Sequence, residues 1–299
     1  MDKLLKAIGM LILSALSGPV MGQDSDIGIL LGASNYGGDL QPAQYTFFES
    51  HPAFSFLYWK ELNGHFNVRG GLSFAQISGD DRFNPKVSTQ VRNLSFHSNI
   101  SELQVALEYT PLDMYQHRFS PYGFAGLALF HFNPTAVDST GKRVFLKPLS
   151  TEGEGLPQFP AQSSYSLIQV AIPIGGGLRY NATSNLTIGV EVGLRVCFTD
   201  YLDDASTLYV DPNILLAQKG PEAVEMAFRT NELPGYKGTP YPAPGTKRAS
   251  SLYKDYYYFS QIMISYRLFS SKSHEPRDHG MGLGKAERSV QCPPNPKKK

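Results

Sequence analysis

The sequence predicts an all-β fold, an antiparallel transmembrane β-barrel of eight strands with long extracellular loops. Three observations lead to this fold. Eight segments alternate apolar and polar residues with the period of a β-strand. The connections between them alternate between long and short in a regular order. An apolar segment typical of an export signal precedes all of them.

Residues 1–22 have the pattern of a cleaved signal peptide. Lys3 and Lys6 precede an apolar run at 8–16, which is shorter than the roughly 18 residues that a membrane-spanning helix needs. Pro19 ends the run, and we expect cleavage after Gly22. The chain then divides into a signal peptide at 1–22, a barrel at 23–269 and a disordered, basic periplasmic tail at 270–299.

Charge and cysteine content exclude several classes of protein. Lysine and arginine together number 27 and aspartate and glutamate 26, so the net charge of +1 provides no basic surface for nucleic acid. No later segment holds an uninterrupted apolar run of about 18 residues, which excludes helical membrane spans. The two cysteines, Cys197 in a predicted strand and Cys292 in the tail, do not form a disulfide framework.

Alternation is clearest in four predicted strands, at 66–74, 102–109, 168–180 and 186–198. In the last of these, every even position from Leu186 to Phe198 is apolar. Weaker alternation predicts four more strands at 27–34, 53–60, 122–132 and 256–268, although the segment 122–132 does not show which face is apolar. Several strands exceed ten residues, a length that suits a tilted strand in a membrane better than a soluble sheet, where about five or six is typical.

The connections indicate which end of the barrel lies outside the cell. Short turns are expected at 63–64, 111–118 and 183–185, and long loops at 37–51, 78–95, 133–165 and 199–254. An even number of strands places both termini on one side. With periplasmic termini, every long loop is extracellular and the protein lies in the outer membrane of a gram-negative bacterium, in contact with its lipid. A soluble sandwich or lipocalin is the alternative, but neither predicts this loop order.

Several charged residues occupy positions that would point into the barrel. Eight strands leave no room for a water channel, and buried charges need partners to offset the loss of hydration. We therefore interpret these residues as a structural plug, with a catalytic or ion-conducting role as the alternative. The predicted lumen charge network consists of Arg69, Glu102, Glu108, Arg179, Glu191, Arg195 and Arg267.

Signals for metal or cofactor chemistry are weak, and we expect no metal and no cofactor. The seven histidines show no metal-ligand spacing, and the glycine run at 175–177 lies inside a strand. Four aspartates of the last long loop could hold calcium, but they lack the spacing of a known calcium loop, and we favour solvated or helix-capping side chains. They are Asp200, Asp203, Asp204 and Asp211.

The signal for an enzyme is also weak, and we expect no catalytic residues. Small barrels can host lipid acyl transfer or deacylation with serine and histidine near the outer rim. Ser95 and His97 are the nearest candidates here, with no evident acidic partner.

Several motifs resemble the successive signatures of one known family. The quoted segments are 32–40, 92–96, 122–126 with 132–134, and 151–153. The strongest is Phe198-Thr199-Asp200-Tyr201-Leu202-Asp203-Asp204-Ala205-Ser206, followed by Tyr209-Val210-Asp211. Together these segments are similar to the PorG family over most of 26–268. The residues that we assign to the family motif are Tyr36, Gly38, Asp39, Thr199, Asp200, Tyr201, Asp203 and Asp204.

This resemblance implies a function that the residue pattern alone does not provide. It implies a structural outer-membrane component of the type IX secretion system, in contact with a periplasmic ring of the proteins PorK and PorN. It carries over no enzymatic residues. Two alternatives remain, an adhesin or receptor that presents its long loops to a ligand and a lipid-modifying barrel enzyme.

Overall fold

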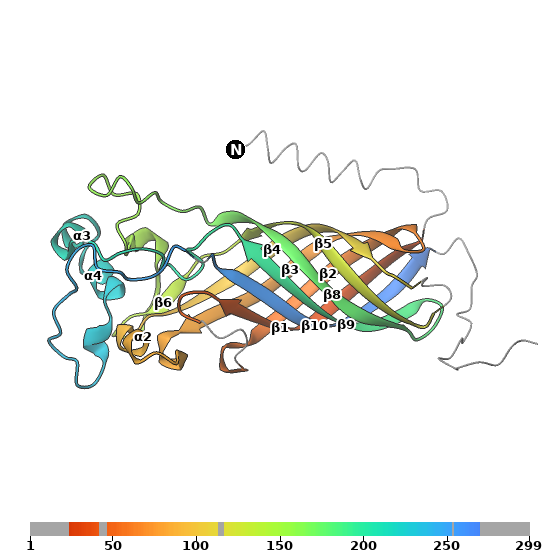
Figure 1. Cartoon of the computed structure of the whole chain (residues 1–299), viewed down its shortest axis with the longest axis horizontal. Helices are drawn as coiled ribbons and strands as arrows, with labels where there is room; N and C mark the ends of the chain where they lie inside the picture. The colour runs from red at the N-terminus through yellow and green to blue at the C-terminus, as the bar shows by residue number, and fades with distance from the viewer. Residues whose placement is uncertain (1–23, 42–46, 113–116, 253, 270–299) are drawn as a thin grey trace, which may run out of the picture.

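The computed structural model describes residues 24–41, 47–112, 117–252 and 254–269. The predicted signal peptide (1–22) and tail (270–299) lie outside these residues and stay predictions. Figure 1 shows a barrel of long, tilted strands with the long connections gathered at one end. The fold predicted from the alternation is confirmed.

Eight long antiparallel strands close the barrel. Around it they follow the order β3-β2-β1-β10-β9-β8-β5-β4, and pairing of β3 with β4 closes the ring. Each contains most of one predicted segment, and β3 and β4 extend furthest beyond it, toward the long loops. They are β1 (Ser25–Gly37), β2 (His51–Asn63), β3 (Phe66–Asp80), β4 (Ser95–Tyr109), β5 (Phe119–His131), β8 (Ile168–Asn181), β9 (Leu186–Cys197) and β10 (Tyr256–Phe269).

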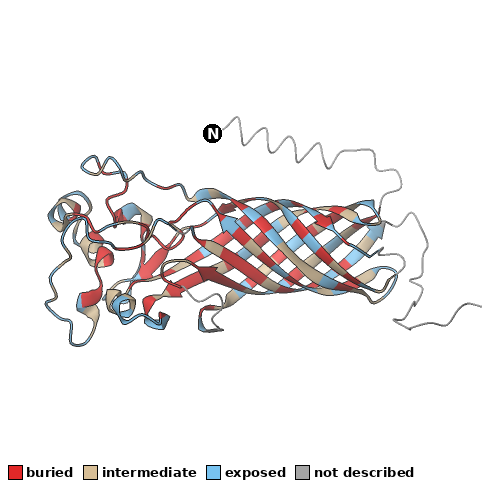
Figure 2. Cartoon of the chain, in the orientation of Figure 1, coloured by how far each residue is buried: buried red, intermediate tan, exposed pale blue. Residues whose placement is uncertain are grey.

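The outer face of the barrel is apolar. Exposed and buried residues alternate along the strands (Figure 2), and the exposed ones are mainly large aliphatic and aromatic side chains. An apolar surface that surrounds a closed barrel fits lipid, since closure leaves no unpaired strand edge. The molecule is therefore a barrel of the outer-membrane type. One exposed apolar residue from each strand is Leu31, Phe56, Leu72, Leu103, Leu127, Ile174, Val192 and Ile262.

Strand β5 has an outer face that its sequence did not reveal. Phe124 and Phe130 point into the barrel and are buried, whereas Leu127 is 64% exposed on the outside. The remaining outward positions of this strand include Gly123 and Ala125, so large apolar residues occur on both faces. The sequence pattern is ambiguous for that reason.

Both ends of the barrel chain lie at the end with the short turns. Ser25 at the start of β1 pairs with Phe269 at the end of β10. Aromatic pairs surround this end: the rings of Phe66 and Tyr109 are 5.1 Å apart, and those of Phe119 and Tyr180 are 6.0 Å apart. Aromatic side chains at this level are typical of a membrane–water boundary.

The long connections fold into what we call the cap, the described residues of 38–50, 81–94, 132–167 and 198–255. It contains the helices α2 (Val87–Arg92), α3 (Pro212–Lys219) and α4 (Pro221–Ala227), and the 3-10 helices η1 (Phe47–Glu49), η2 (Asp81–Phe83), η3 (Lys147–Leu149) and η4 (Thr230–Glu232). A short hairpin of β6 (Thr135–Val137) and β7 (Arg143–Phe145) joins the sheet beside β4. Of the helices described, none has the length and apolar composition to cross a membrane.

The cap packs onto the barrel through an apolar core that the sequence did not predict. One cluster of buried side chains continues from the loop end of the strands into the cap. It includes Phe96 and Phe130 of the barrel together with Leu202 and Met226 of the cap. The described parts of the long connections are therefore packed onto the barrel and are not solvated loops.

Candidate functional site

The predicted lumen charges meet across the inside of the barrel. Arg69 of β3 and Glu191 of β9 form two hydrogen bonds, from Nη1 to Oε2 at 2.6 Å and from Nη2 to Oε1 at 3.0 Å. These strands stand opposite each other in the ring of eight. The Arg69 guanidinium also lies 3.5 Å from the centre of the Phe124 ring. The pair therefore spans the full width of the lumen.

Two more pairs use the other predicted glutamates. Arg179 contacts Glu108 at 2.6 Å, and Glu108 also accepts from Trp59 Nε1 at 3.1 Å. Arg195 donates to both oxygens of Glu102 at 3.1 Å. These side chains are nearly inaccessible to water. Three arginines and three glutamates thus compensate one another inside the described barrel.

Arg267 lies apart from these six residues. Its side chain points inward at the short-turn end and is 15% exposed. Its Nε is 3.2 Å from Asp26 Oδ1, and its Nη1 is 3.7 Å from Asp24 Oδ2. Neither aspartate was singled out from the sequence. Asp24 directly precedes β1, and Asp26 is the second residue of that strand.

Family-motif residues from the end of β1 and from the first loop meet those of the last loop at the base of the cap. The Tyr36 hydroxyl is 2.7 Å from Asp203 Oδ2 and 2.9 Å from Asp255 Oδ1. A Cβ atom at Gly38 would overlap both the Tyr36 hydroxyl and the Asp255 carboxylate, so this position requires glycine. The carboxylate of Asp39 accepts from the Ser250 amide at 2.7 Å.

The contact of one hydroxyl with two buried carboxyl groups requires an additional proton. Tyr36 can donate to only one of Asp203 and Asp255, so the other carboxyl group must be protonated and donate to the hydroxyl oxygen. Burial raises the pKa of Asp203 well above its usual value, as it does the pKa of Asp255, where the charge of Asp203 adds to the effect. A protonated carboxyl group and the tyrosine hydroxyl can then link these three side chains through two hydrogen bonds.

The remaining motif residues hold the last loop in shape. Thr199 Oγ1 accepts from the Tyr201 amide at 3.2 Å, and the Tyr201 ring stacks on Tyr165 at 4.8 Å. Asp200 accepts from the Ser206 hydroxyl at 2.7 Å. Asp204 accepts from the Thr151 and Tyr165 hydroxyls at 2.7 and 2.6 Å. The motif therefore connects separate loops by polar contacts.

Other residues central to the cap were not among the site residues predicted from the sequence. Glu152 accepts from Arg248 Nη1 at 2.8 Å and from the amides of Ser206 and Thr207. Arg92 makes two hydrogen bonds to Asp81, at 2.7 and 2.8 Å. Glu152 and Arg92 lie in quoted family segments, but no pattern in the loop at 199–254 indicates that Arg248 would be buried.

The four aspartates proposed as an alternative calcium site do not converge. Asp211 caps helix α3 by accepting from the Asn213 amide at 2.8 Å, as the capping interpretation expects. Asp200, Asp203 and Asp204 accept hydrogen bonds from hydroxyl and amide groups. Within the described ranges, no three histidine, cysteine, aspartate or glutamate side chains are arranged to hold a metal ion.

The Ser95–His97 candidate for lipid chemistry lies at the loop end of β4. The Ser95 hydroxyl accepts from Arg229 Nη1 at 3.3 Å, and the His97 ring contacts that of His51 at 5.9 Å. A serine–histidine contact at this rim involves other residues, since His51 Nε2 lies 2.6 Å from Ser78 Oγ. Ser78 is only 1% exposed.

Comparison with known proteins gives one family match and several similar structures. The family described as "Domain of unknown function (DUF6089)" matches residues 2–147. No curated protein matches the chain. Among solved structures, the chain is similar to Ail, the attachment invasion locus protein of Yersinia pestis, with 14% identity and a TM-score of 0.38, over 83% of this chain and 100% of that one.

Two further structures have comparable similarity. The N-terminal β-barrel domain of Pseudomonas aeruginosa OprF is 11% identical with a TM-score of 0.36, over 83% of this chain and 100% of that one. Neisserial surface protein A is 9% identical with a TM-score of 0.37, over 80% of this chain and 95% of that one. At these values the similarities assign no function to the chain.

Proposed function

We propose that this chain is a structural outer-membrane component of a type IX secretion system, which holds a periplasmic ring of the PorK and PorN type at the membrane. The resemblance of its motifs to the PorG family supports this role. The observation that carries it is the filled lumen, since the contact between Arg69 and Glu191 crosses the barrel. An eight-stranded barrel whose lumen is filled by side chains cannot conduct a folded protein across the membrane. Its part in secretion is therefore to position other components.

The proposed orientation follows from the ends of the strands. Ser25 and Phe269 lie together at the short-turn end, and a chain exported by a signal peptide enters the outer membrane from the periplasm. We therefore place the short turns in the periplasm and the cap outside the cell. The ring would contact the short turns, among them residues 63–64 and 183–185, and the tail at 270–299.

Insertions at opposite ends of the barrel test this proposal. A short hydrophilic peptide inserted after Ser184 should reduce co-purification of the ring from mild-detergent membranes and impair export. The same peptide after Gly238, an open position in the cap, should leave both unchanged. Gene deletion should block export of proteins with the secretion signal without changing permeability to small solutes. Normal export after deletion would contradict the proposal, as would lipid hydrolysis by the purified barrel that depends on His97.

A second candidate function, an adhesin or receptor, is favoured by one feature of the cap. Phe48 and Phe83 come from different loops and stack at 5.8 Å, although they are 83% and 39% exposed. Exposed aromatic pairs are typical of binding surfaces. If this function holds, Phe48→Ser with Phe83→Ser should abolish ligand or cell binding while export stays normal.

A further inference from the structure

A polar hollow lies on the outside of the barrel, directly beyond the apolar surface. On β3 the outward residues change from Phe74 to Gln76, and on β5 from Leu129 to His131. On β4 the outward residues beyond Leu103 are Ser101, Asn99 and His97. Strand pairing places Gln76 beside Asn99, and Ser101 beside His131. The hollow therefore continues the lipid-facing surface and is separate from the lumen.

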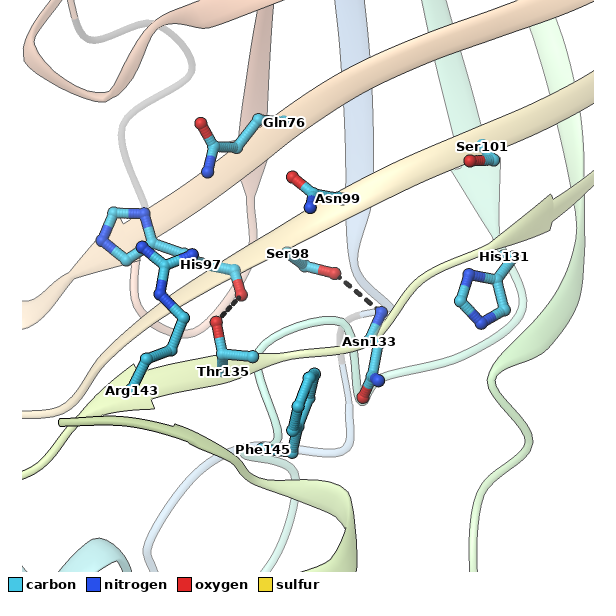
Figure 3. A pocket seen from close by; sticks show the side chains of 10 residues that line it. All are labelled: Gln76, His97, Ser98, Asn99, Ser101, His131, Asn133, Thr135, Arg143 and Phe145. Atoms are coloured by element: carbon cyan, nitrogen blue, oxygen red, sulfur yellow. Dashed lines mark hydrogen bonds between the residues drawn. The ribbon is translucent and has the colours of Figure 1, made fainter.

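The β6–β7 hairpin covers this hollow from the side of the cap. Thr135 pairs with His97 and donates from its hydroxyl to the His97 carbonyl at 2.9 Å. Thr135 also pairs with Phe145, and Val137 pairs with Arg143, which brings Arg143 and Phe145 over the outer face of β4. Figure 3 shows His97 and Arg143 on one side of the hollow and His131 with Ser101 on the other.

The side chains that line the hollow suit an anion. They comprise one guanidinium, two imidazoles, three amides and three hydroxyls, with Phe145 as the one apolar residue and no carboxylate. Throughout the described ranges, the Arg143 guanidinium has no ion pair and no hydrogen bond, so it is available to a ligand. Arginine binds phosphoryl oxygens through charge-assisted hydrogen bonds, and the N–H groups of imidazoles and amides can donate to the same oxygens.

The volume and position of the hollow favour a lipid over a soluble ligand. The hollow has a volume of about 280 Å³, at the lower limit for small-molecule sites and suited to a headgroup. Its floor borders the outward-facing apolar side chains of Phe74, Leu103 and Leu129, along which acyl chains can lie. Phe145 is 54% exposed beside it. A soluble anion would make no contact with these apolar side chains.

We propose that this hollow binds the phosphoryl headgroup of a membrane lipid, with Arg143 as the cationic contact and His97, His131, Gln76 and Asn99 as hydrogen-bond donors. The acyl chains then follow the outer faces of β3, β4 and β5. A bound lipid of this kind fixes the level of the barrel in the membrane and supports the β6–β7 hairpin. The proposal is independent of any role in secretion, because it concerns only the outer surface.

Native mass spectrometry of the full mature protein in detergent tests the headgroup. The probes are lipid A, which bears phosphate on a sugar headgroup, and the same lipid after removal of its phosphates. We expect the wild-type protein to retain lipid A and to lose the dephosphorylated lipid. Inorganic phosphate alone, in large excess, should not displace lipid A. Equal retention of both lipids, or displacement by inorganic phosphate, would overturn the assignment to a phosphorylated lipid.

Substitutions test the residues. Arg143→Gln should weaken retention of lipid A roughly tenfold, because one charge-assisted contact is lost. His97→Leu with His131→Leu removes two hydrogen-bond donors from the hollow and provides a second, independent variant that should also weaken retention of lipid A. Lys142→Gln is the matched control, since Lys142 is in the same hairpin, is exposed and does not line the hollow. Unchanged retention in both variants, each shown to be folded by its heat-dependent gel mobility, would refute the site, as would an equal loss with Lys142→Gln.

Discussion

At the scale of single residues, the buried charges of the lumen are stabilised by their partners. Each of Glu102, Glu108 and Glu191 accepts from an arginine and also from a neutral donor, such as Tyr257 for Glu102 and Tyr122 for Glu191. Removing both members of a buried pair can be neutral for stability, whereas removing one leaves an uncompensated charge in a dry interior. The two kinds of substitution should therefore differ strongly.

Arg195→Met should lower the free energy of unfolding by about 3–5 kcal/mol, because Glu102 loses its charged partner while it stays buried. The double variant Arg195→Met with Glu102→Gln should recover part of this loss. Urea unfolding of the barrel in lipid vesicles measures both. The control is Arg82→Met, which removes a largely exposed arginine paired with Asp80 and should leave the midpoint unchanged. Equal midpoints for the Arg195 and Arg82 variants would show that Arg195 faces water.

Acid should stabilise the cap through its buried aspartates. Burial raises the pKa of Asp204 to about 6 against the opposing charge of Arg248, and burial raises the pKa of Asp200 to about 6 against its hydrogen bond from Ser206. In an opened loop, an aspartate has a pKa of about 3.9. Between about pH 4 and about pH 6, the closed cap therefore binds more protons than the open cap. Its stability is greatest below about pH 4 and falls as pH rises through about 6.

Hydrogen exchange of the backbone amides at 200–206 checks this dependence. Protection factors, which correct for the intrinsic pH dependence of exchange, should fall by roughly tenfold or more between pH 4 and pH 7. Asp204→Asn should reduce the change, because the amide cannot titrate. Asp138→Asn, in the exposed hairpin turn, should leave it intact. Protection that rises with pH would contradict the assigned proton uptake.

At the scale of elements, the strands could be predicted from the sequence and the cap could not. Alternation is a local signal, and even the weak segment at 53–60 became a strand because one face meets lipid and the other the lumen. The three-residue strands β6 and β7 are too short to show any period. The cap depends on contacts between distant loops, such as Arg248 with Glu152, and a single sequence carries no local signal for them.

The ion pairs of the lumen could be predicted only in part from the sequence. Inward positions followed from alternation, but the partner of each arginine depends on the register around the ring. Arg69 therefore pairs mainly with Glu191 across the barrel, although Glu108 on the neighbouring strand β4 is 3.7 Å from its Nη1. The family-motif residues were assigned by resemblance, and the structure brings Tyr36 at the end of β1 and Gly38 of the first loop together with Asp203 of the last loop.

The junction of β1 with the cap depends on Gly38. Gly38→Ala should separate Tyr36 from Asp255 and loosen the last loop, because the added methyl group has no space. Limited proteolysis of the folded protein should then cut within 199–254 faster than in the wild type. Gly70→Ala is the matched control, since a Cβ there meets only ordinary contacts from 3.5 Å outward. Equal cleavage rates in both variants would show that the close approach at Gly38 does not hold the cap.

At the scale of the whole molecule, the interior and the exterior of the barrel have separate tasks. The apolar outer face meets lipid, the polar hollow under the β6–β7 hairpin lies at one boundary, and the aromatic pairs lie at the other. Ion pairs occupy the lumen, and the cap packs over the end of the barrel that carries the long loops. A lumen filled in this way supports the proposed structural role and argues against transport through the barrel.

Conductance of the purified, reconstituted barrel in planar lipid bilayers tests this central claim most directly. We expect no openings above the background of protein-free bilayers, because paired arginines and glutamates fill the interior from β3 across to β9. The variant Arg69→Ala with Glu191→Ala removes the pair that spans the lumen and serves as a positive control for a widened interior. Discrete, ion-selective openings of the wild-type barrel would contradict the account, since they would show a continuous water path where the structure places the ion pairs.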